Sequence, residues 1–235
     1  MTTQHTPDDG HSSIEHLLVQ DHPRAVRFAV GLLFIALSLF IAMAIPPVRD
    51  AIEQFDKAIY DVTYPIKWGP LTVLAHALDF LGSSLFVWPL RLVMTIYLSW
   101  RRRWVALATW LLAIALSEPF IGSLKALYDR ARPPVALVDV ESGSFPSGHS
   151  VAGAVVALSL AVCLVSAGPR RRNLELAAAA FALVMGGSRI YLGAHWLTDV
   201  VAGVAFGAAV VLASAAVVQW WRERRLALIA DQMSA

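Results

Sequence analysis

Long apolar runs, separated by short polar and arginine-rich connections, constrain this chain more than any other feature of its sequence. A helix needs about 20 mostly apolar residues to cross a bilayer, because each residue adds only about 1.5 Å to its length. Six segments meet this requirement, at residues 25–46, 71–99, 104–124, 147–167, 174–191 and 196–219. The sequence therefore predicts an all-α polytopic membrane bundle with six transmembrane helices.

The composition supports a membrane protein. Hydrophobic residues make up 57% of the chain and charged residues 15%, whereas soluble domains are roughly 45–50% apolar. The one cysteine, Cys163, lies inside an apolar run, which excludes a disulfide framework. No strongly charged tail indicates nucleic acid as a partner.

Two segments depart from a simple spanning helix. The run at 71–99 is long enough to tilt or extend beyond the hydrocarbon, and it contains Pro89, which predicts a kink. Residues 48–70 mix both charge signs with apolar residues and include Trp68 and several tyrosines. These residue types favour an interfacial segment between the first two spans.

Arginine clusters predict the orientation of the bundle. They occur at 101–103, at 170–172 and in "WRERRL" after the last run, and basic connections favour the cytoplasmic side of a membrane. With six spans, this places both termini in the cytoplasm. Residues 125–146 and 192–195 then lie on the opposite face, together with the interfacial segment.

The same topology divides the chain into three parts. Residues 1–24 form a polar cytoplasmic lead without the features of a signal peptide. Residues 25–219 form the six-span domain, and residues 220–235 form a basic cytoplasmic tail. Scattered histidines in the lead are interpreted as solvent-exposed rather than as a metal site: His5, His11, His16 and His22.

Three polar clusters fall on the predicted outer face: "KALYDRARP", "PSGH" and "SRIYLGAHWLTD". They bring together cations without an equal number of carboxylates, which predicts an anion-binding site. Arg132 and Arg189 can each present a planar fork to phosphate oxygens, and Lys125 offers a compact charge.

The second cluster also has the features of a helix N-terminus. Ser147 follows Pro146 and precedes a helix-forming stretch, so it is expected to cap that helix. The backbone amides of Gly148 and its neighbours would then point outward, where they bind phosphate well. Gly148 has no side chain and lets a ligand approach the backbone closely.

Two histidines add the groups that phosphoryl transfer requires. His195 and Asp199 are four residues apart, so on one helix face the carboxylate can bond one ring nitrogen and leave the other free to attack. His149 comes from a different helix and can protonate the leaving oxygen.

The spacing of these residues resembles the three-part signature of the type 2 phosphatidic acid phosphatase (PAP2) superfamily. The matching residues are Lys125-x6-Arg132-Pro133, Pro146-Ser147-Gly148-His149 and Ser188-Arg189-x5-His195-x3-Asp199. The resemblance implies a six-span, metal-independent phosphatase that needs no cofactor and forms a phosphohistidine on His195 with the help of Asp199. It further implies His149 as the acid and base, and a phosphate site formed by Lys125, Arg132, Ser147, Gly148 and Arg189.

The expected substrate is a lipid phosphate or diphosphate, since a site at the bilayer boundary suits an amphiphile. Undecaprenyl diphosphate is favoured because the short chain lacks an extra soluble domain, while phosphatidylglycerol phosphate, phosphatidate and a lipid A type glycolipid stay open. The expected location is the bacterial inner membrane, with the site on its periplasmic or extracytoplasmic face. Membrane lipids are the expected surroundings, with no nucleic acid and no required protein partner.

Three other functions would use some of the same residues. A phosphotransferase would use the same phosphohistidine with an alcohol in place of water. A non-catalytic protein would only bind lipid phosphates, although the complete set of His149, His195 and Asp199 opposes this. A zinc site at His195 and Asp199 is disfavoured because the nearby arginines would repel a metal ion.

Four further charged residues lie in or near the predicted spans. Arg130 is expected to be a helix-end charge that reaches the interface. Glu118, inside the third span, is expected to be structural, with a partner such as Arg91. Asp79 is expected to border the mouth of the substrate site.

Two further pairs of residues have structural explanations. Gly203 and Gly207 form a GxxxG pattern that is interpreted as helix packing within the bundle rather than a dimer interface. Asp139 and Glu141 are expected in a solvated loop, because acids beside a phosphate site would repel the substrate.

Overall fold

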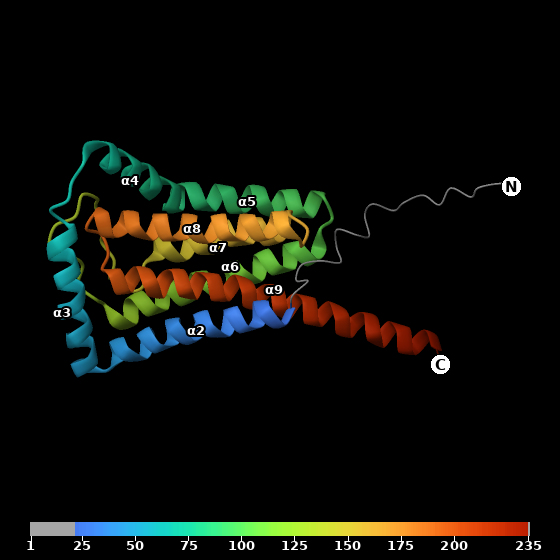
Figure 1. The fold of residues 1–235 in the computed structure, drawn as a ribbon. Helices are drawn as coiled ribbons and strands as arrows, with labels where there is room; N and C mark the ends of the chain where they lie inside the picture. The colour runs from blue at the N-terminus through green and yellow to red at the C-terminus, as the bar shows by residue number, and fades with distance from the viewer. Residues whose placement is uncertain (1–21, 235) are drawn as a thin grey trace.

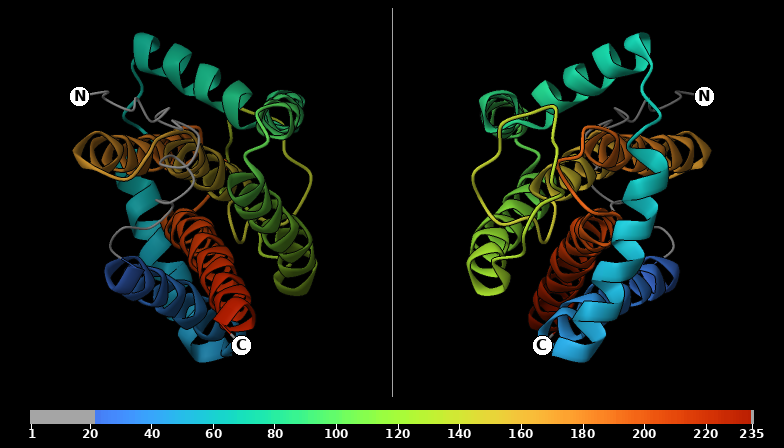
Figure 2. Two further views of the ribbon diagram at one scale, coloured as in Figure 1. Left: turned by 90° about the vertical axis from the view of Figure 1, so that its right-hand side faces the viewer. Right: turned by 90° about the vertical axis from the view of Figure 1, so that its left-hand side faces the viewer.

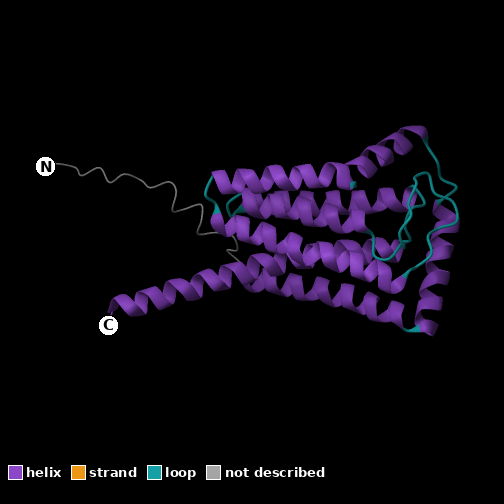
Figure 3. Cartoon of the chain, turned by 180° about the vertical axis from the view of Figure 1, so that it is seen from behind, coloured by secondary structure: helices purple, strands orange, loops and turns teal. Residues whose placement is uncertain are grey.

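The structure, a computed structural model, describes residues 22–234, which form a helical bundle without strands (Figure 3). The helices are α2 (His22–Ala44), α3 (Pro46–Thr63), α4 (Gly69–Gly82), α5 (Ser84–Trp100), α6 (Trp104–Tyr128), α7 (Gly148–Leu164), α8 (Pro169–Tyr191) and α9 (Leu197–Ser234). The prediction of an all-α fold is confirmed. The histidines predicted to be exposed in the N-terminal lead, His5, His11 and His16, lie outside the described residues, as does the side chain of His22.

Each of the six apolar segments is helical. The helices α2, α6, α8 and α9 are each long and apolar enough to cross a membrane, and α4 and α5 meet the same test together as a bent pair. The helix α7 is apolar but has only 17 residues. A membrane-helical fold is thus confirmed, while six spans and cytoplasmic termini remain predictions.

The second apolar segment breaks at a different place from the one predicted. The helices α4 and α5 are bent by 51° relative to each other, at Ser83, whereas Pro89 lies inside α5. The break thus lies six residues before Pro89, and α5 continues through this proline. Ser83 has an extended backbone (φ −72°, ψ 156°) that ends one helix and begins the next. The preceding Gly82 packs so closely on His149 that a Cβ there would overlap the imidazole ring.

The helix α3 lies across one end of the bundle instead of along it (Figures 1 and 2). Its sequence carries both charge signs, and its inward face buries Asp56 and Tyr60. This orientation suits the interfacial segment predicted between the first two spans.

The two ends of the bundle differ in character. Most of the irregular backbone gathers at the end covered by α3, where α6 leads into α7 and α8 into α9 (Figure 3). The arginine-rich α5–α6 and α7–α8 connections lie at the opposite end, from which the C-terminal part of α9 extends (Figure 1). The polar clusters and the arginine clusters therefore lie at opposite ends, as the predicted topology requires.

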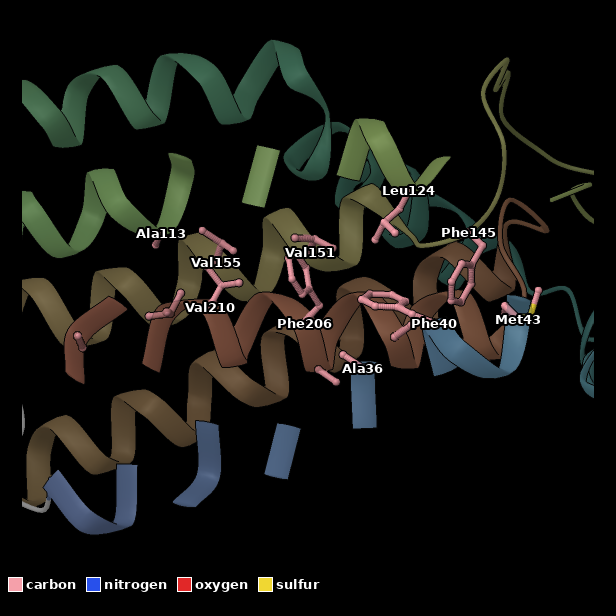
Figure 4. Close-up of a cluster of buried hydrophobic side chains, with 14 of the residues drawn as sticks. Ala36, Phe40, Met43, Ala113, Leu124, Phe145, Val151, Val155, Phe206 and Val210 are labelled. Atoms are coloured by element: carbon pink, nitrogen blue, oxygen red, sulfur yellow. The ribbon is translucent and has the colours of Figure 1, made fainter. Parts of the chain in front are cut away.

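A buried apolar cluster fixes α7 against α2, α6 and α9 (Figure 4). Phe40 makes edge contacts with Phe145 and Phe206, at centroid distances of 5.7 and 5.9 Å. A Cβ on Gly203 would lie 2.7 Å from the carbonyl oxygen of Ser147, and one on Gly207 would lie 2.8 Å from that of Val151. The two glycines thus pack α9 on α7 within the bundle, as predicted.

Candidate active site

The three predicted polar clusters meet at one cavity of about 290 Å³. Six of the predicted site residues line it: Lys125, Arg132, Gly148, His149, Arg189 and His195. The other two, Ser147 and Asp199, are fully buried beside the cavity. The backbone N–H of Ser147 donates to the backbone oxygen of Asp199, and the carboxylate of Asp199 contacts His195. The structure therefore brings together residues from α6, α7, α8, α9 and two connecting segments.

The imidazole of His195 has a defined orientation. Its Nδ1 lies 3.4 Å from Oδ2 of Asp199, which also accepts a hydrogen bond of 2.9 Å from the backbone N–H of Trp196. Its Nε2 lies 3.2 Å from Nη1 of Arg132. Because arginine can only donate and the carboxylate can only accept, the ring proton belongs on Nδ1. The lone pair of Nε2 then faces the cavity cations.

Burial also keeps His195 neutral. It lowers the pKa of His195 from 6.5 to about 4, although the hydrogen bond and charge of Asp199 act in the opposite direction. The positive charge of Arg132 lowers it further. A neutral imidazole at physiological pH is the form required of a nucleophile.

Asp199 is held in turn by Arg130, for which the sequence predicts a position at the membrane interface. That prediction is wrong, because Arg130 is buried. Its Nη1 donates to Oδ1 of Asp199 at 2.6 Å, and its Nη2 donates to Oδ2 of Asp56 at 2.8 Å. Asp56 also accepts from the backbone N–H of Thr198 at 3.1 Å. The two carboxylates thus offset the free-energy cost of burying the charge of Arg130.

Two of the cavity cations are held by backbone carbonyls. Lys125 Nζ donates to the carbonyl oxygen of Gly143 at 2.6 Å. Arg132 donates to those of Ser142 and Ala194, at 2.7 and 2.6 Å. Within residues 22–234 neither side chain forms a salt bridge, so their positive charge remains available to an anion. Burial, followed by the charge of Arg189, lowers the pKa of Arg132.

Asp79 links the third cation to the second histidine. Its Oδ1 pairs with Nη1 of Arg189 and lies 3.2 Å from Nε2 of His149, and its backbone oxygen lies 3.1 Å from the same nitrogen. Since both oxygens are acceptors, Nε2 of His149 carries a proton. Asp79, expected to border the substrate mouth, contacts two predicted site residues.

Ser147 caps α7 as predicted. Its Oγ accepts from the backbone N–H of Ser150 at 3.4 Å and from the hydroxyl of Ser150 at 2.9 Å, and its own N–H donates to the backbone oxygen of Asp199 at 3.0 Å. These bonds join the start of α7 to the start of α9. Gly148 lines the cavity at the first position of the helix, where amides have no partner within the helix. A direct contact between Ser147 and phosphate remains a prediction.

Glu118 pairs with Arg91 at 2.5 Å, which confirms the expected structural partner, and both residues line the cavity. Asp139 and Glu141 are exposed in the loop before α7, as expected.

The zinc alternative finds no support in the donor set. Within the part of the chain that the structure describes, no group of three His, Cys, Asp or Glu side chains could hold a metal ion. Arg130 and Arg132 lie directly beside Asp199 and His195 instead, and their charges would repel a cation.

The site was only partly predictable. The sequence does not reveal the link from Asp56 through Arg130 to Asp199, because its two hydrogen bonds join residues 74 and 69 positions apart. The only signal in the sequence was the mixed charge of α3, which does not identify a partner.

The chain is similar to known proteins of one family. The PAP2 superfamily matches residues 106–223, which include all three polar clusters. Phosphatidylglycerophosphatase B of Bacillus subtilis (strain 168) is 32% identical over 174 residues, covering 72% of this chain and 85% of the relative.

Two crystal structures share the fold. The transmembrane PAP2 type phosphatidylglycerolphosphate phosphatase from Bacillus subtilis superposes with a TM-score of 0.69 at 30% identity, covering 83% of this chain and 96% of that one. Aquifex aeolicus LpxE superposes with a TM-score of 0.56 at 24% identity, covering 67% and 92%. The second comparison supports the fold alone.

Proposed function

Because the chain belongs to the PAP2 superfamily and is a membrane phosphatase, we propose that it removes the terminal phosphate of a membrane lipid through a phosphohistidine on His195. The observation that carries this proposal is the orientation of His195. Asp199 accepts a hydrogen bond from the Nδ1–H of His195, and the lone pair of Nε2 faces a cavity lined by cations.

In the first step, Nε2 of His195 attacks the phosphorus atom, and the bond from phosphorus to the lipid oxygen breaks. His149, protonated on both ring nitrogens at the start of the step, gives one of its protons to that leaving oxygen and becomes neutral. Lys125, Arg132 and Arg189 stabilise the charge on the phosphoryl oxygens, as does the amide of Gly148. Such preorganised donors account for much of the rate acceleration in phosphoryl transfer.

In the second step, water attacks the phosphorus atom of the phosphohistidine. His149, now neutral, accepts a proton from the water and returns to its doubly protonated form. The phosphorus–nitrogen bond breaks, inorganic phosphate leaves and His195 is restored as a neutral imidazole. Asp199 stabilises the positive imidazole in between.

The lipid nature of the substrate is supported by a second, apolar cavity. A groove of about 530 Å³ lies between α5, α7 and α8, and Val87 and Ala152 line both this groove and the polar cavity. A hydrocarbon chain in the groove would leave its headgroup next to the histidines. The name of the Bacillus subtilis relative makes phosphatidylglycerophosphate the first candidate. The other candidates are undecaprenyl diphosphate, phosphatidate and a lipid A type glycolipid.

We also propose that the site faces the non-cytoplasmic side of a bacterial inner membrane. Support comes from the arginine-rich connections at the opposite end of the bundle (Figure 1), because such connections favour the cytoplasm.

The test is a panel of these lipids with purified wild-type and His195→Ala protein. Wild type should release inorganic phosphate, and His195→Ala should retain less than about one-thousandth of that rate. Full activity of His195→Ala on every lipid would contradict the proposal. Adding an alcohol in excess distinguishes the phosphotransferase, which would form a new phosphoester instead of free phosphate.

A further inference from the structure

The polar cavity contains one cation that the proposed reaction does not use. Arg91 of α5 lines it together with its partner Glu118 and with Trp88. Glu118 lies about two turns, or roughly 10 Å, before Lys125 along α6. The Arg91–Glu118 pair therefore lies toward the middle of the bundle, away from the connections that carry His195 and Arg132.

Arg91 is buried, and two of its hydrogen-bond donor nitrogens have no acceptor among the described residues. Its side chain is 4% exposed, and one nitrogen, Nη1, bonds to Glu118. Neither Nε nor Nη2 has a hydrogen-bond acceptor within residues 22–234. The ring of Trp88 lies 5.0 Å from Cζ and covers the guanidinium without accepting these bonds. Buried donors without acceptors cost free energy, and an anion in the cavity would satisfy them.

The positive charges around the cavity are also sufficient to bind more than one anionic group. Arg91 is paired with Glu118, and Arg189 with Asp79, whereas Lys125 and Arg132 bond only to neutral groups within the described residues. The paired Arg91 thus contributes hydrogen-bond donors rather than excess charge.

We propose that Arg91 binds a second phosphate of the lipid, one that lies between the phosphate being removed and the hydrocarbon. This inference rests on the proposed function. A lipid whose terminal phosphate is at His195 extends toward the apolar groove, and Val87, one turn before Arg91 on α5, lines both spaces. A second phosphate on that path reaches Nε and Nη2 of Arg91. Arg91 therefore selects lipids with two phosphate groups over phosphatidate, which has one.

Two kinds of lipid share this chemistry. The two phosphates are joined by a single oxygen in undecaprenyl diphosphate and by a glycerol in phosphatidylglycerophosphate. The separation of roughly 10 Å between Glu118 and Lys125 along α6 favours the longer glycerol spacer.

The experiment compares kcat/KM for phosphatidylglycerophosphate, undecaprenyl diphosphate and phosphatidate. The variant is Arg91→Met combined with Glu118→Gln, so that no buried carboxylate loses its partner. Glu118→Gln alone is the matched control, because it keeps the donors of Arg91. We expect the preference for phosphatidylglycerophosphate over phosphatidate to fall at least about tenfold in the double variant and to persist in the control. If kcat/KM relative to phosphatidate fell for undecaprenyl diphosphate alone, Arg91 would still bind a second phosphate. The preferred lipid would then be the one whose two phosphates share a single oxygen.

Equal losses for all three lipids in the double variant would overturn the proposal, since they would show a merely structural role. Binding of the same lipids is measured in parallel on His195→Ala protein, with and without the two cavity substitutions. If wild type turned over none of the lipids, the proposed function would fail. The subsite would then be supported by a tenfold loss of binding preference on replacing Arg91, and overturned by an unchanged preference.

Discussion

The orientation of His195 depends on a carboxylate that is itself held in place. One carboxylate oxygen of Asp199 accepts a hydrogen bond from Nη1 of Arg130. The other oxygen accepts hydrogen bonds from the imidazole of His195 and from a backbone N–H. Arg130 is fixed by Asp56 of α3. Arg130 and Asp56 are thus positioning residues. They do not line the cavity, but through Asp199 they orient the imidazole of His195, which does.

Replacing Arg130 with Gln should lower kcat by about 10- to 100-fold and change KM by less than about threefold, because the loss concerns the orientation of the nucleophile rather than contact with the lipid. Steady-state kinetics of detergent-purified protein measures both. The matched control is Glu53→Gln, since Glu53 is partly exposed and lies 3.8 Å from Nε of Arg130. An Arg130→Gln protein with wild-type kcat would exclude the positioning role.

The burial of His195 predicts a pH-dependent stability. The unfolded chain takes up a proton near pH 6.5, whereas the folded protein does so only near pH 4. Stability is therefore lost as the pH falls through this window, by up to about 3 kcal/mol for this group.

Thermal unfolding midpoints of substrate-free wild type and His195→Gln, measured from pH 7 to pH 4, isolate this contribution. The midpoint of wild type should fall relative to that of His195→Gln over the window. Parallel curves would show that His195 titrates normally in the folded protein.

The break between α4 and α5 is the element that most directly shapes the site. It brings Gly82 against the ring of His149 and places Asp79, one turn earlier on α4, beside the same imidazole. A straight helix over 71–99 would not turn at this point. The bend is thus part of the structure that holds the proposed acid.

A side chain at Gly82 should therefore displace His149. Gly82→Ala is expected to lower kcat at least about tenfold, because a general acid contributes about 10²- to 10⁴-fold when correctly placed. Gly122→Ala is the matched control, since a Cβ on that helical glycine meets nothing within 4 Å. If Gly82→Ala and Gly122→Ala had the same kcat as wild type, the close packing at Gly82 would have no part in catalysis.

At the scale of the whole molecule, the orientation of the protein in the membrane can be tested, because the site and the arginine-rich connections lie at opposite ends of the bundle. Cys163 is the one cysteine and is fully buried, so a Cys163→Ala background allows single exposed cysteines to be introduced. Asp139→Cys lies in the loop at the site end, and Asn173→Cys lies near the start of α8 at the other end. In intact cells, a membrane-impermeant thiol reagent should label the first and spare the second. The reverse pattern would place the site in the cytoplasm.

The features that could be predicted from the sequence are the local ones. Apolar length identified six helical segments, and fixed spacing identified Lys125, Arg132, His149 and His195, because these signals need only neighbouring residues. The partners of Arg130 could not be found this way, since they come from other helices.

The packing of the bend at Ser83 was missed for a similar reason. The break falls at Gly82, Ser83 and Ser84, and glycine–serine pairs are sites where helices kink, but this local signal does not show that Gly82 packs against His149. Packing between distant segments was thus the information that the sequence patterns lacked.

The phosphohistidine itself provides the most direct test. Purified wild type is mixed with a lipid carrying a labelled terminal phosphate and quenched within one turnover. The account predicts a label on the protein that is stable in alkali, labile in acid and located at His195 by peptide mapping. It also predicts that His195→Ala carries no label. Rapid phosphate release by wild type with no labelled protein at any time, or with the label on another residue, would contradict it.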